Sequence, residues 1–225
     1  MRRTVLNLVI AESALELVPK EIARHPSVVS DSRRSEAEGS TLLLDRSIHH
    51  AAMVKLEDQF KRGRPDLVHV TLLNATSTPL YQDGRAKVFI HTRNDVVLEF
   101  KEQTRPPKSY ARFRDLMRKT LREMPETGLI KTYQLPMEGL LKRMAGDEVV
   151  GLSIQGRESN FADLAVRLTA KRNPTVLVGG FPRGHFEPET ARSLDSLVRV
   201  DRHPLDAHVV VARLIYEVER HCMST

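Results

Sequence analysis

One short segment constrains the fold of this chain more than any other. Residues 175–186 read TVLVGGFPRGHF, an aliphatic and β-branched run that stops at paired glycines. Such a run is typical of a buried parallel strand that opens into a tight loop. Open α/β sheets bind their ligands at the carboxyl ends of parallel strands, and glycine lets the backbone there come close to a ligand. The loop is therefore a candidate binding site in an α/β fold.

Two further segments repeat this form in the last third of the chain. Residues 148–156 read EVVGLSIQG and residues 197–207 read LVRVDRHPLDA, each a strand followed by a polar loop. A helix over 209–218 follows the second loop, with Pro204 expected in its first turn. The glycines do not fit G-x-G-x-x-G or G-x-x-x-x-G-K-S/T, so the loops are not predicted to cradle a pyrophosphate. We expect the three loops to converge on one ligand.

The remaining segments alternate between strand and helix patterns. We expect strands over 4–10, 41–44, 67–72 and 128–132, helices over 47–60, 108–122, 140–144 and 160–170, and a hairpin of 88–90 and 96–98 around Asn94 and Asp95. Asp45 or Ser47 can cap the first helix, and Ser159 or Asn160 the last. The Ser-, Arg- and Glu-rich segment 27–40 is predicted to be a mobile excursion. No repeat or linker divides the chain, which predicts one domain over 1–225.

The composition narrows the class of protein and of site. A chain of 225 residues with 40% hydrophobic residues is long enough for one domain with a sizeable core. Cys222 is the only cysteine, which excludes an internal disulfide and a C-x-x-C site and fits a reducing compartment. No run of about 18 apolar residues and no signal-peptide pattern is present, so we expect a cytoplasmic protein without a membrane partner. His49 and His50 point roughly 100° apart on their helix and no H-E-x-x-H motif exists, so we expect no metal site.

Basic residues gather in one stretch of a chain that is basic overall. The formal net charge is +6, from 35 Lys and Arg against 29 Asp and Glu. Eight basic residues fall within 101–122 and form what we call the basic stripe: Lys101, Arg105, Lys108, Arg112, Arg114, Arg118, Lys119 and Arg122. On the helix expected over 108–122, apolar side chains take the opposite face. The stripe suits a polyanion such as RNA, and a merely solvated helix face is the alternative.

Taken together, these motifs resemble a known family. The loop GGFPRGHF, the strand before Pro204 and Leu205, and the segments LLDRSIHH (43–50) and RGRPDLVH (62–69) resemble the ribosome-biogenesis methyltransferases that modify N1 of pseudouridine in small-subunit rRNA. These enzymes belong to the SPOUT class, which uses S-adenosylmethionine, and the resemblance spans residues 7–217. It implies a homodimer and a mostly parallel α/β sheet with a carboxyl-terminal trefoil knot. It also implies an inserted β-hairpin extension over approximately 78–105.

The resemblance also assigns roles to individual residues. Arg64 matches the arginine of the base pocket and Asp66 the carboxylate that orients it, while Arg105, Lys108 and Arg112 match residues that contact RNA. Lys108 stands where arginine is usual and loses the planar two-donor fork. The implied cofactor-binding residues are Leu152, Ser153, Gly179, Gly184, Val198, Arg199, Val200, Asp201, Arg202 and His203. The last three depart from the smaller or aromatic residues expected there, so mostly backbone contacts are expected.

The chemistry of such a reaction needs positioning and charge rather than a metal. Pseudouridine keeps a free N1–H, and loss of that proton spreads negative charge onto the neighbouring carbonyl oxygens, where cationic donors stabilise it. Tyr110 and Phe113 are candidates for stacking on an extruded base, with a core position favoured for Phe113.

Two other functions stay open. One is an RNA-binding assembly factor with incidental or no catalysis, whose partners include small-subunit rRNA and possibly ribosomal proteins of the small subunit. The other is a nucleotide-binding α/β enzyme acting on a small molecule, which predicts no affinity for RNA.

Overall fold

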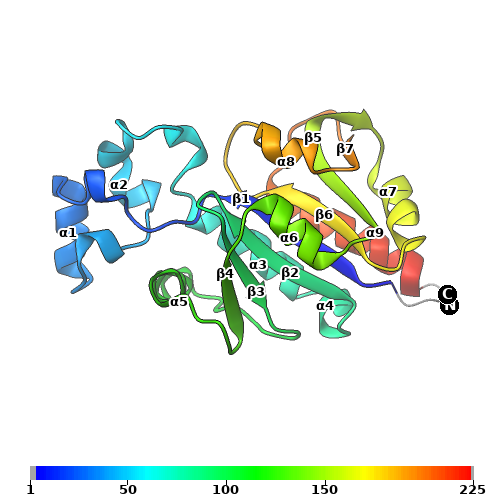
Figure 1. The fold of residues 1–225 in the computed structure, drawn as a ribbon, viewed down its shortest axis with the longest axis horizontal. Coiled ribbons are helices and arrows are strands. Elements are labelled where there is room, and N and C mark those ends of the chain that lie inside the picture. Colours follow the sequence, from blue (N-terminus) through cyan, green and yellow to red (C-terminus); the bar gives the residue numbers. More distant parts are fainter. Residues whose placement is uncertain (1–3, 224–225) are drawn as a thin grey trace.

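A mixed sheet runs through the centre of the molecule (Figure 1). The computed structural model describes residues 4–223, and within them seven strands pair in the order β4-β3-β2-β1-β6-β5-β7. Their bounds are β1 (Leu6–Ser13), β2 (Ala86–Thr92), β3 (Val96–Phe100), β4 (Ile130–Gln134), β5 (Glu148–Glu158), β6 (Pro174–Gly179) and β7 (Ser196–Arg199). β1, β2, β5, β6 and β7 are mutually parallel, whereas β3 is antiparallel to both of its neighbours.

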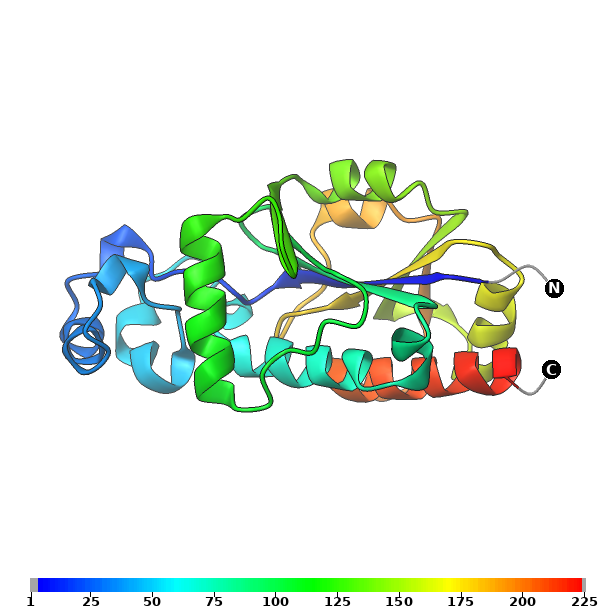
Figure 2. The same cartoon turned by 90° about the horizontal axis from the view of Figure 1, so that it is seen from below.

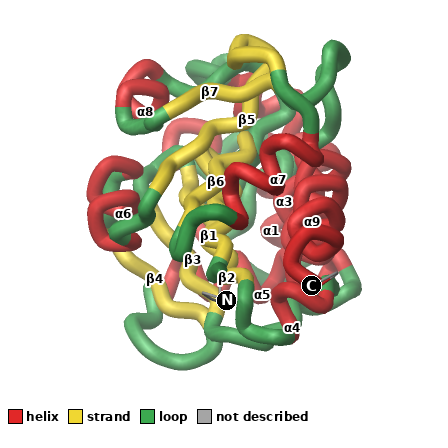
Figure 3. The backbone as a smooth tube through the Cα atoms, turned by 90° about the vertical axis from the view of Figure 1, so that its right-hand side faces the viewer, coloured by secondary structure: helices red, strands yellow, loops and turns green. Residues whose placement is uncertain are grey.

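Helices cover both faces of the sheet (Figure 3). On one face lie α3 (Pro65–Thr76), α4 (Pro79–Gln82), α7 (Phe161–Thr169) and α9 (Ala207–Met223), and on the other lie α6 (Met137–Met144) and α8 (Pro188–Arg192). A lobe at one end holds α1 (Pro26–Arg34) and α2 (Arg46–Met53), with short 3-10 turns at Lys20–Ile22, Gly39–Thr41 and Gln59–Lys61. Helix α5 (Tyr110–Glu123) stands across the sheet next to this lobe (Figure 2).

The central strands are buried because helices cover them on both sides. All eight residues of β1 are buried, and so are the first five of β6, as is typical of parallel strands. The larger core cluster joins the sheet to α3 and α9, a smaller one lies beneath α6, and a third fills the lobe around α1 and α2. The carboxyl ends of β5, β6 and β7 are thereby held at one edge.

Several sequence predictions are confirmed. Strands occupy 6–13, 130–134, 148–158, 174–179 and 196–199, β2 and β3 form the antiparallel hairpin, and helices occupy 110–123, 137–144, 161–169 and 207–223. Asp45 caps α2 by accepting a hydrogen bond from Ser47 N at 2.9 Å. Asn160 caps α7 in the same way through Asp163 N at 2.8 Å.

The prediction of a strand over 67–72 is wrong, because these residues belong to helix α3. Pro65 occupies the first turn and Asp66 adds a negative charge there, both of which favour a helix start. Val68 and Leu72 are fully buried, whereas Val70 is 36% exposed. A strand would have placed all three on one face, so the burial pattern follows the helical period.

Other boundaries also differ from the predictions. Residues 41–44 form only an isolated bridge, between Leu43 and Leu17, and 27–40 contains helix α1 instead of an irregular excursion. The helix expected over 47–60 ends at Met53, and Asp58 then takes a left-handed φ of 52° that an α-helix does not accommodate. Pro204 lies ahead of α9, which begins only at Ala207.

The helical assignment of α3 predicts opposite outcomes at two neighbouring apolar positions. Leu72→Ala should lower the free energy of unfolding by about 2–5 kcal/mol because it empties a buried site. Val70→Lys should change it by less than about 0.5 kcal/mol, since that side chain faces solvent. Urea unfolding of both variants checks this. A loss of similar size at both positions would support the strand instead.

Candidate functional site

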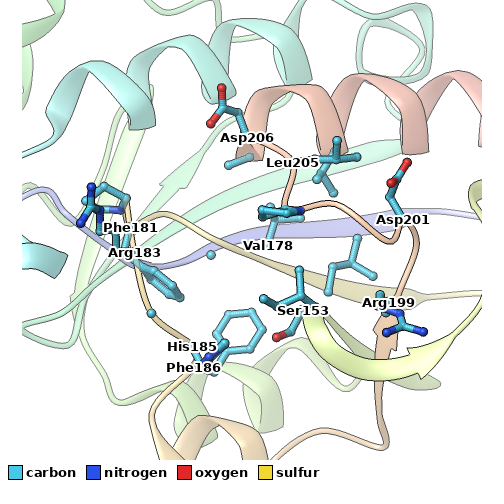
Figure 4. A pocket seen from close by; sticks show the side chains of 18 of the residues that line it. Ser153, Val178, Phe181, Arg183, His185, Phe186, Arg199, Asp201, Leu205 and Asp206 are labelled. Atoms are coloured by element: carbon cyan, nitrogen blue, oxygen red, sulfur yellow. The ribbon is translucent and has the colours of Figure 1, made fainter.

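Strand β5 and the loops that follow β6 and β7 surround a pocket of about 520 Å³ (Figure 4). Leu152 and Ser153 lie within β5, residues 181–186 follow β6, and residues 200, 201 and 203–206 follow β7. Leu67 of α3 and Val210 of α9 complete the wall. The three carboxyl-terminal segments therefore converge as expected, although the first contributes strand residues and not a loop, in a pocket of the size that small ligands and cofactors occupy.

Eight of the ten residues predicted to bind a cofactor line this pocket. They are Leu152, Ser153, Gly179, Gly184, Arg199, Val200, Asp201 and His203. Val198 is only 4% exposed and packs into the main core. The side chain of Arg202 is exposed and bonds through Nε to His203 Nε2 at 3.1 Å, beside a shallow surface depression that Glu158 also lines.

The structure adds pocket residues that the sequence analysis missed. Phe181 and Phe186 meet edge to face, with ring centroids 5.9 Å apart, and Leu205 faces them from the loop after β7. Two aromatic residues inside a glycine loop are a signal that could have been used, because an exposed aromatic ring usually has a partner or a ligand to cover. Asp206 at the start of α9 adds a carboxylate to the rim.

One glycine serves the protein rather than a ligand. A Cβ on Gly180 would lie 2.3 Å from Ser13 Oγ and 2.8 Å from Ser13 Cα, closer than real contacts allow. Gly180 N donates to Ala11 O at 2.7 Å, and Ala14 N donates to Gly180 O at 2.8 Å. The loop after β6 is thus joined to the end of β1. By contrast, Gly184 faces the pocket with a φ of +98°, which side chains rarely adopt.

Arg64 and Asp66 form the ion pair expected from the sequence. Arg64 Nε lies 2.8 Å from Asp66 Oδ1 and Nη2 lies 2.9 Å from Oδ2, a two-bond pairing at the first turn of α3. Both side chains are partly exposed. Burial is the largest influence and would raise the pKa of Asp66, but the hydrogen bonds and charge of Arg64, together with backbone amides at the start of α3, outweigh it and hold that pKa below its ordinary value. The pair borders the pocket, because Leu67 of the same turn lines it.

The basic stripe lies on α5 and the segment before it. Arg105, Lys108 and Arg112 are exposed. Phe113 is fully buried and stacks on His69 with ring centroids 4.3 Å apart, which confirms its predicted core position. His69 Nε2 also lies 2.7 Å from Pro107 O. Because His69 belongs to α3, these contacts hold the stripe against the helix that directly follows Arg64.

Tyr110 is committed to the protein as well. Its hydroxyl donates to Asp45, the residue that caps α2. Burial, reinforced by this carboxylate, raises the pKa of Tyr110 well above its ordinary value. The side chain therefore anchors α5 to the lobe, and a base stacked on it would have to replace that contact.

The adjacent residues His49 and His50 differ in burial, and the contacts of His49 are with other groups of the protein. His49 is fully buried, accepts a hydrogen bond from Asp45 N through Nδ1 at 3.1 Å and lies 3.4 Å from Asp31, whereas His50 is exposed. Over residues 4–223 no cluster of three or more His, Cys, Asp or Glu side chains has the arrangement of a metal site. Within the same range, every helix is too short or too polar to span a bilayer.

Comparison with known proteins gives a consistent result. The model of the family described as EMG1/NEP1 methyltransferase matches residues 8–219. The chain is 39% identical over 221 residues to the ribosomal RNA small subunit methyltransferase Nep1 of Thermococcus kodakarensis, covering 96% of this chain and 98% of the relative. It is 42% identical over 217 residues to the Nep1 of Pyrobaculum neutrophilum, covering 94% and 96%.

A solved structure agrees with the sequence matches. The crystal structure of Archaeoglobus fulgidus Nep1 bound to S-adenosylhomocysteine superposes with a TM-score of 0.85 at 31% identity, covering 98% of this chain and 99% of that one. With a family match over most of its length and a shared fold, this chain belongs to the EMG1/NEP1 methyltransferase family.

Proposed function

We propose that this protein transfers a methyl group from S-adenosylmethionine to N1 of a pseudouridine in small-subunit rRNA. The observation that carries the proposal is the two-bond Arg64–Asp66 pair at the border of the pocket. Relatives named as small-subunit rRNA methyltransferases and a structural neighbour bound to S-adenosylhomocysteine support it.

The pocket residues fit S-adenosylmethionine. Leu152, Val178 and Leu205 offer an apolar slot for the adenine ring, and Ser153 and Asp201 offer polar groups at its ends. Bound there, the cofactor supplies an electrophilic methyl group. We assign cofactor contacts to the eight predicted residues that line the pocket. For Val198 and Arg202, whose side chains lie outside it, we propose backbone contacts alone.

Arg64 would act on the base. Its Nε and Nη2 face Asp66, so the Nη1 side of the guanidinium is left to meet a carbonyl oxygen of pseudouridine. A fixed cation at that oxygen stabilises the negative charge that develops when N1 loses its proton. Asp66 keeps the guanidinium aimed, because a two-bond pair fixes both its position and its plane.

The basic stripe would bind the RNA that carries the base. Arg105, Lys108 and Arg112 are exposed, and the packing of α5 on α3 through His69 places them on the element that leads to Arg64. Phosphates bound along the stripe would direct a loop of rRNA toward the pocket, where the target base is extruded.

The architecture implied by the family resemblance also belongs to this proposal. The trefoil knot is supported by the family match over residues 8–219. In that region β5 and β7 pair closely, since Leu152 and Arg157 both pair with Val198 across a register shift, and a Cβ on Gly156 would lie 2.4 Å from Val198 N. Exposed apolar side chains at Val166 and Tyr216 offer a face for a homodimer. We also propose that 1–225 is a single domain in which approximately 78–105 is the inserted hairpin extension. A cytoplasmic location and an interaction with ribosomal proteins of the small subunit stay predictions.

An RNA-binding assembly factor is the second candidate function, and the exposed basic stripe favours it. The two functions differ in what the pocket formed by β5 and the loops after β6 and β7 does. Measured affinity for S-adenosylmethionine separates them, because an assembly factor without catalysis has no need of the cofactor. An enzyme acting on a small molecule would instead bind a nucleotide ligand and show no affinity for RNA.

Arg64→Ala should slow methyl transfer roughly a hundred- to thousand-fold while cofactor affinity stays near wild type. Arg64→Lys should restore little activity, since an ammonium cannot keep both bonds to Asp66 and reach the base. Single-turnover methylation of a pseudouridine-containing hairpin at saturating cofactor measures this, with Arg172→Ala, an exposed arginine outside the site, as the matched control. Equal rates for Arg64→Ala and wild type, or methylation of a uridine hairpin whose N1 is blocked by ribose, would overturn the assigned pocket.

The pairing also predicts how Asp66 titrates. Because its pKa in the folded protein is lowered, the pair contributes stability above the ordinary aspartate pKa, and this contribution is lost as the pH falls through the lowered value. Arg64→Ala leaves burial as the main influence, so the pKa of Asp66 should move from below its ordinary value to above it. Carbon-13 NMR titration of the aspartate carboxyl groups measures the change. No movement would show that Arg64 does not hold the carboxylate in solution.

RNA affinity should depend steeply on salt because each neutralised phosphate releases counterions. Changing Arg105 and Arg112 to alanine should flatten the plot of log affinity against log salt by about one unit for each phosphate that is no longer neutralised. Changing Arg33 and Arg34, exposed arginines of α1 outside the stripe, serves as the control and should leave the slope nearly unchanged. If both pairs flatten the slope equally, the stripe has no special part in RNA binding.

A further inference from the structure

The side chain of Lys61 joins the lobe that holds α1 and α2 to the loop that follows β6. Lys61 ends the 3-10 turn Gln59–Lys61, three residues before Arg64, and its side chain is 21% exposed. Its Nζ donates to His185 O at 2.5 Å and to Glu187 Oε1 at 2.6 Å. These bonds join positions 124 and 126 residues apart in the chain.

Two further groups surround the same ammonium. Glu12 Oε2 lies 3.6 Å from Nζ, and the ring of Phe181 lies 4.8 Å from it. Glu12 also holds the loop directly, because its Oε1 accepts a hydrogen bond from Glu187 N at 2.8 Å. Lys61 and Glu12 therefore contact the loop through the carbonyl of His185, the carboxylate and amide of Glu187, and the ring of Phe181.

The backbone of Glu12 has an unfavourable conformation, which indicates that its surroundings hold it in place. Glu12 lies in the irregular part of β1 between Ile10 and Ser13, has a left-handed φ of 48° and is 7% exposed. A residue with a Cβ takes this conformation only where its surroundings hold it. Lys61, Glu187 and Thr190 are the surroundings that its carboxylate contacts.

Apolar packing holds the loop at Phe186, which packs against the smaller core cluster beneath α6. Phe181, Gly184 and Phe186 face the pocket of about 520 Å³. A second cavity of about 410 Å³ lies on the other side of the loop, lined by Glu12, Lys61 and Glu187 among others. Between the junction of Gly180 with β1 and the packed ring of Phe186, the loop borders the pocket, and there Lys61 contacts it at Phe181 and His185.

We propose that Lys61 is a positioning residue that holds the loop 180–187 in the conformation that binds the cofactor. Lys61 itself does not line the cofactor pocket, so it acts through the loop. The inference rests on the proposed function only in taking the 520 Å³ pocket as the cofactor site.

Without the ammonium, the loop samples other conformations and only a fraction of the molecules is competent to bind. The apparent dissociation constant rises as the inverse of that fraction, so a competent fraction of about one tenth weakens binding about tenfold. The rate of methyl transfer at saturating cofactor stays close to wild type, because bound cofactor restores the loop and Arg64 is untouched.

The test is calorimetric titration with S-adenosylhomocysteine. Lys61→Met keeps the length and apolar stem of the side chain and should raise the dissociation constant about tenfold. Lys55→Met, an exposed lysine between α2 and the 3-10 turn, is the matched control and should leave it unchanged. Thermal unfolding establishes that each variant is folded, and single-turnover rates at saturating cofactor should stay within about twofold of wild type.

A double mutant then tests whether Lys61 and Glu187 hold the loop through their mutual contact. Glu187→Gln removes the carboxylate on which Lys61 rests and should weaken binding on its own. Combined with Lys61→Met it should add little, because both changes remove the same contact. If Lys61→Met does not fold, Glu187→Gln, whose side chain is largely exposed, decides the question alone.

Three results would overturn the proposal. Unchanged affinity in folded Lys61→Met means that the loop keeps its conformation without Lys61. Strictly additive effects of the two changes mean that Lys61 and Glu187 act separately. A slower rate of methyl transfer with unchanged affinity makes Lys61 part of the chemistry. A pocket variant keeps this distinct from failure of the proposed function. If Leu205→Glu binds S-adenosylhomocysteine as tightly as wild type, the pocket is not the cofactor site, whatever Lys61 does.

Discussion

The junction between Gly180 and the end of β1 is the constraint on which the site depends. Gly180 exchanges two backbone hydrogen bonds with Ala11 and Ala14, and the contact with Ser13 leaves no room for a side chain. Ala14 O in turn accepts a hydrogen bond from Arg64 N at 3.1 Å. The same short stretch of β1 thus holds both the loop of the cofactor pocket and the start of α3. The two halves of the proposed reaction meet there because one strand end binds them both.

A buried ion pair stabilises the segment that carries Arg64. Arg62 donates from Nε and Nη2 to the two oxygens of Glu16, at 2.8 and 2.7 Å, with both residues almost fully buried. Breaking such a pair is strongly destabilising, typically about 3–5 kcal/mol, because the remaining charge is left in an apolar place. This fixed pair contrasts with Arg64 and Asp66 two positions further on, which remain half-exposed and open to a substrate. Burial separates the arginine that supports the structure from the arginine proposed to act on the base.

The elements of the carboxyl-terminal half of the chain were easier to predict from the sequence than those of the amino-terminal half. The run that became β6 is short, β-branched and ends at glycine, and the run that became β5 has Val149 and Val150 near its start, so few alternatives compete with a strand. The run at 67–72 is equally apolar but lies in a helix, since periodicity cannot assign so short a segment, and Pro65 with Asp66 was the better signal. The Arg64–Asp66 pair was predictable because its members are two residues apart.

Parts of the site could not be read from the sequence because they depend on distant partners. Lys61 meets His185 and Glu187 only in the folded chain. The side chains of Val198 and Arg202 face away from the pocket although their neighbours line it, and the direction of each side chain follows from how the end of β5 crosses β7. A prediction that assigns cofactor contacts to every residue of 198–203 cannot tell which of these side chains face the pocket.

The central claim is that cofactor and base meet where β5 and the loops after β6 and β7 face Arg64. A crystal structure of the protein with S-adenosylhomocysteine and a pseudouridine-containing RNA hairpin tests it most directly. We expect the cofactor in the pocket lined by Leu152, Gly179 and Leu205, with a carbonyl oxygen of the extruded base within hydrogen-bond distance of Arg64 and N1 facing the sulfur. Cofactor bound elsewhere, or a base held without contact to Arg64, would contradict it.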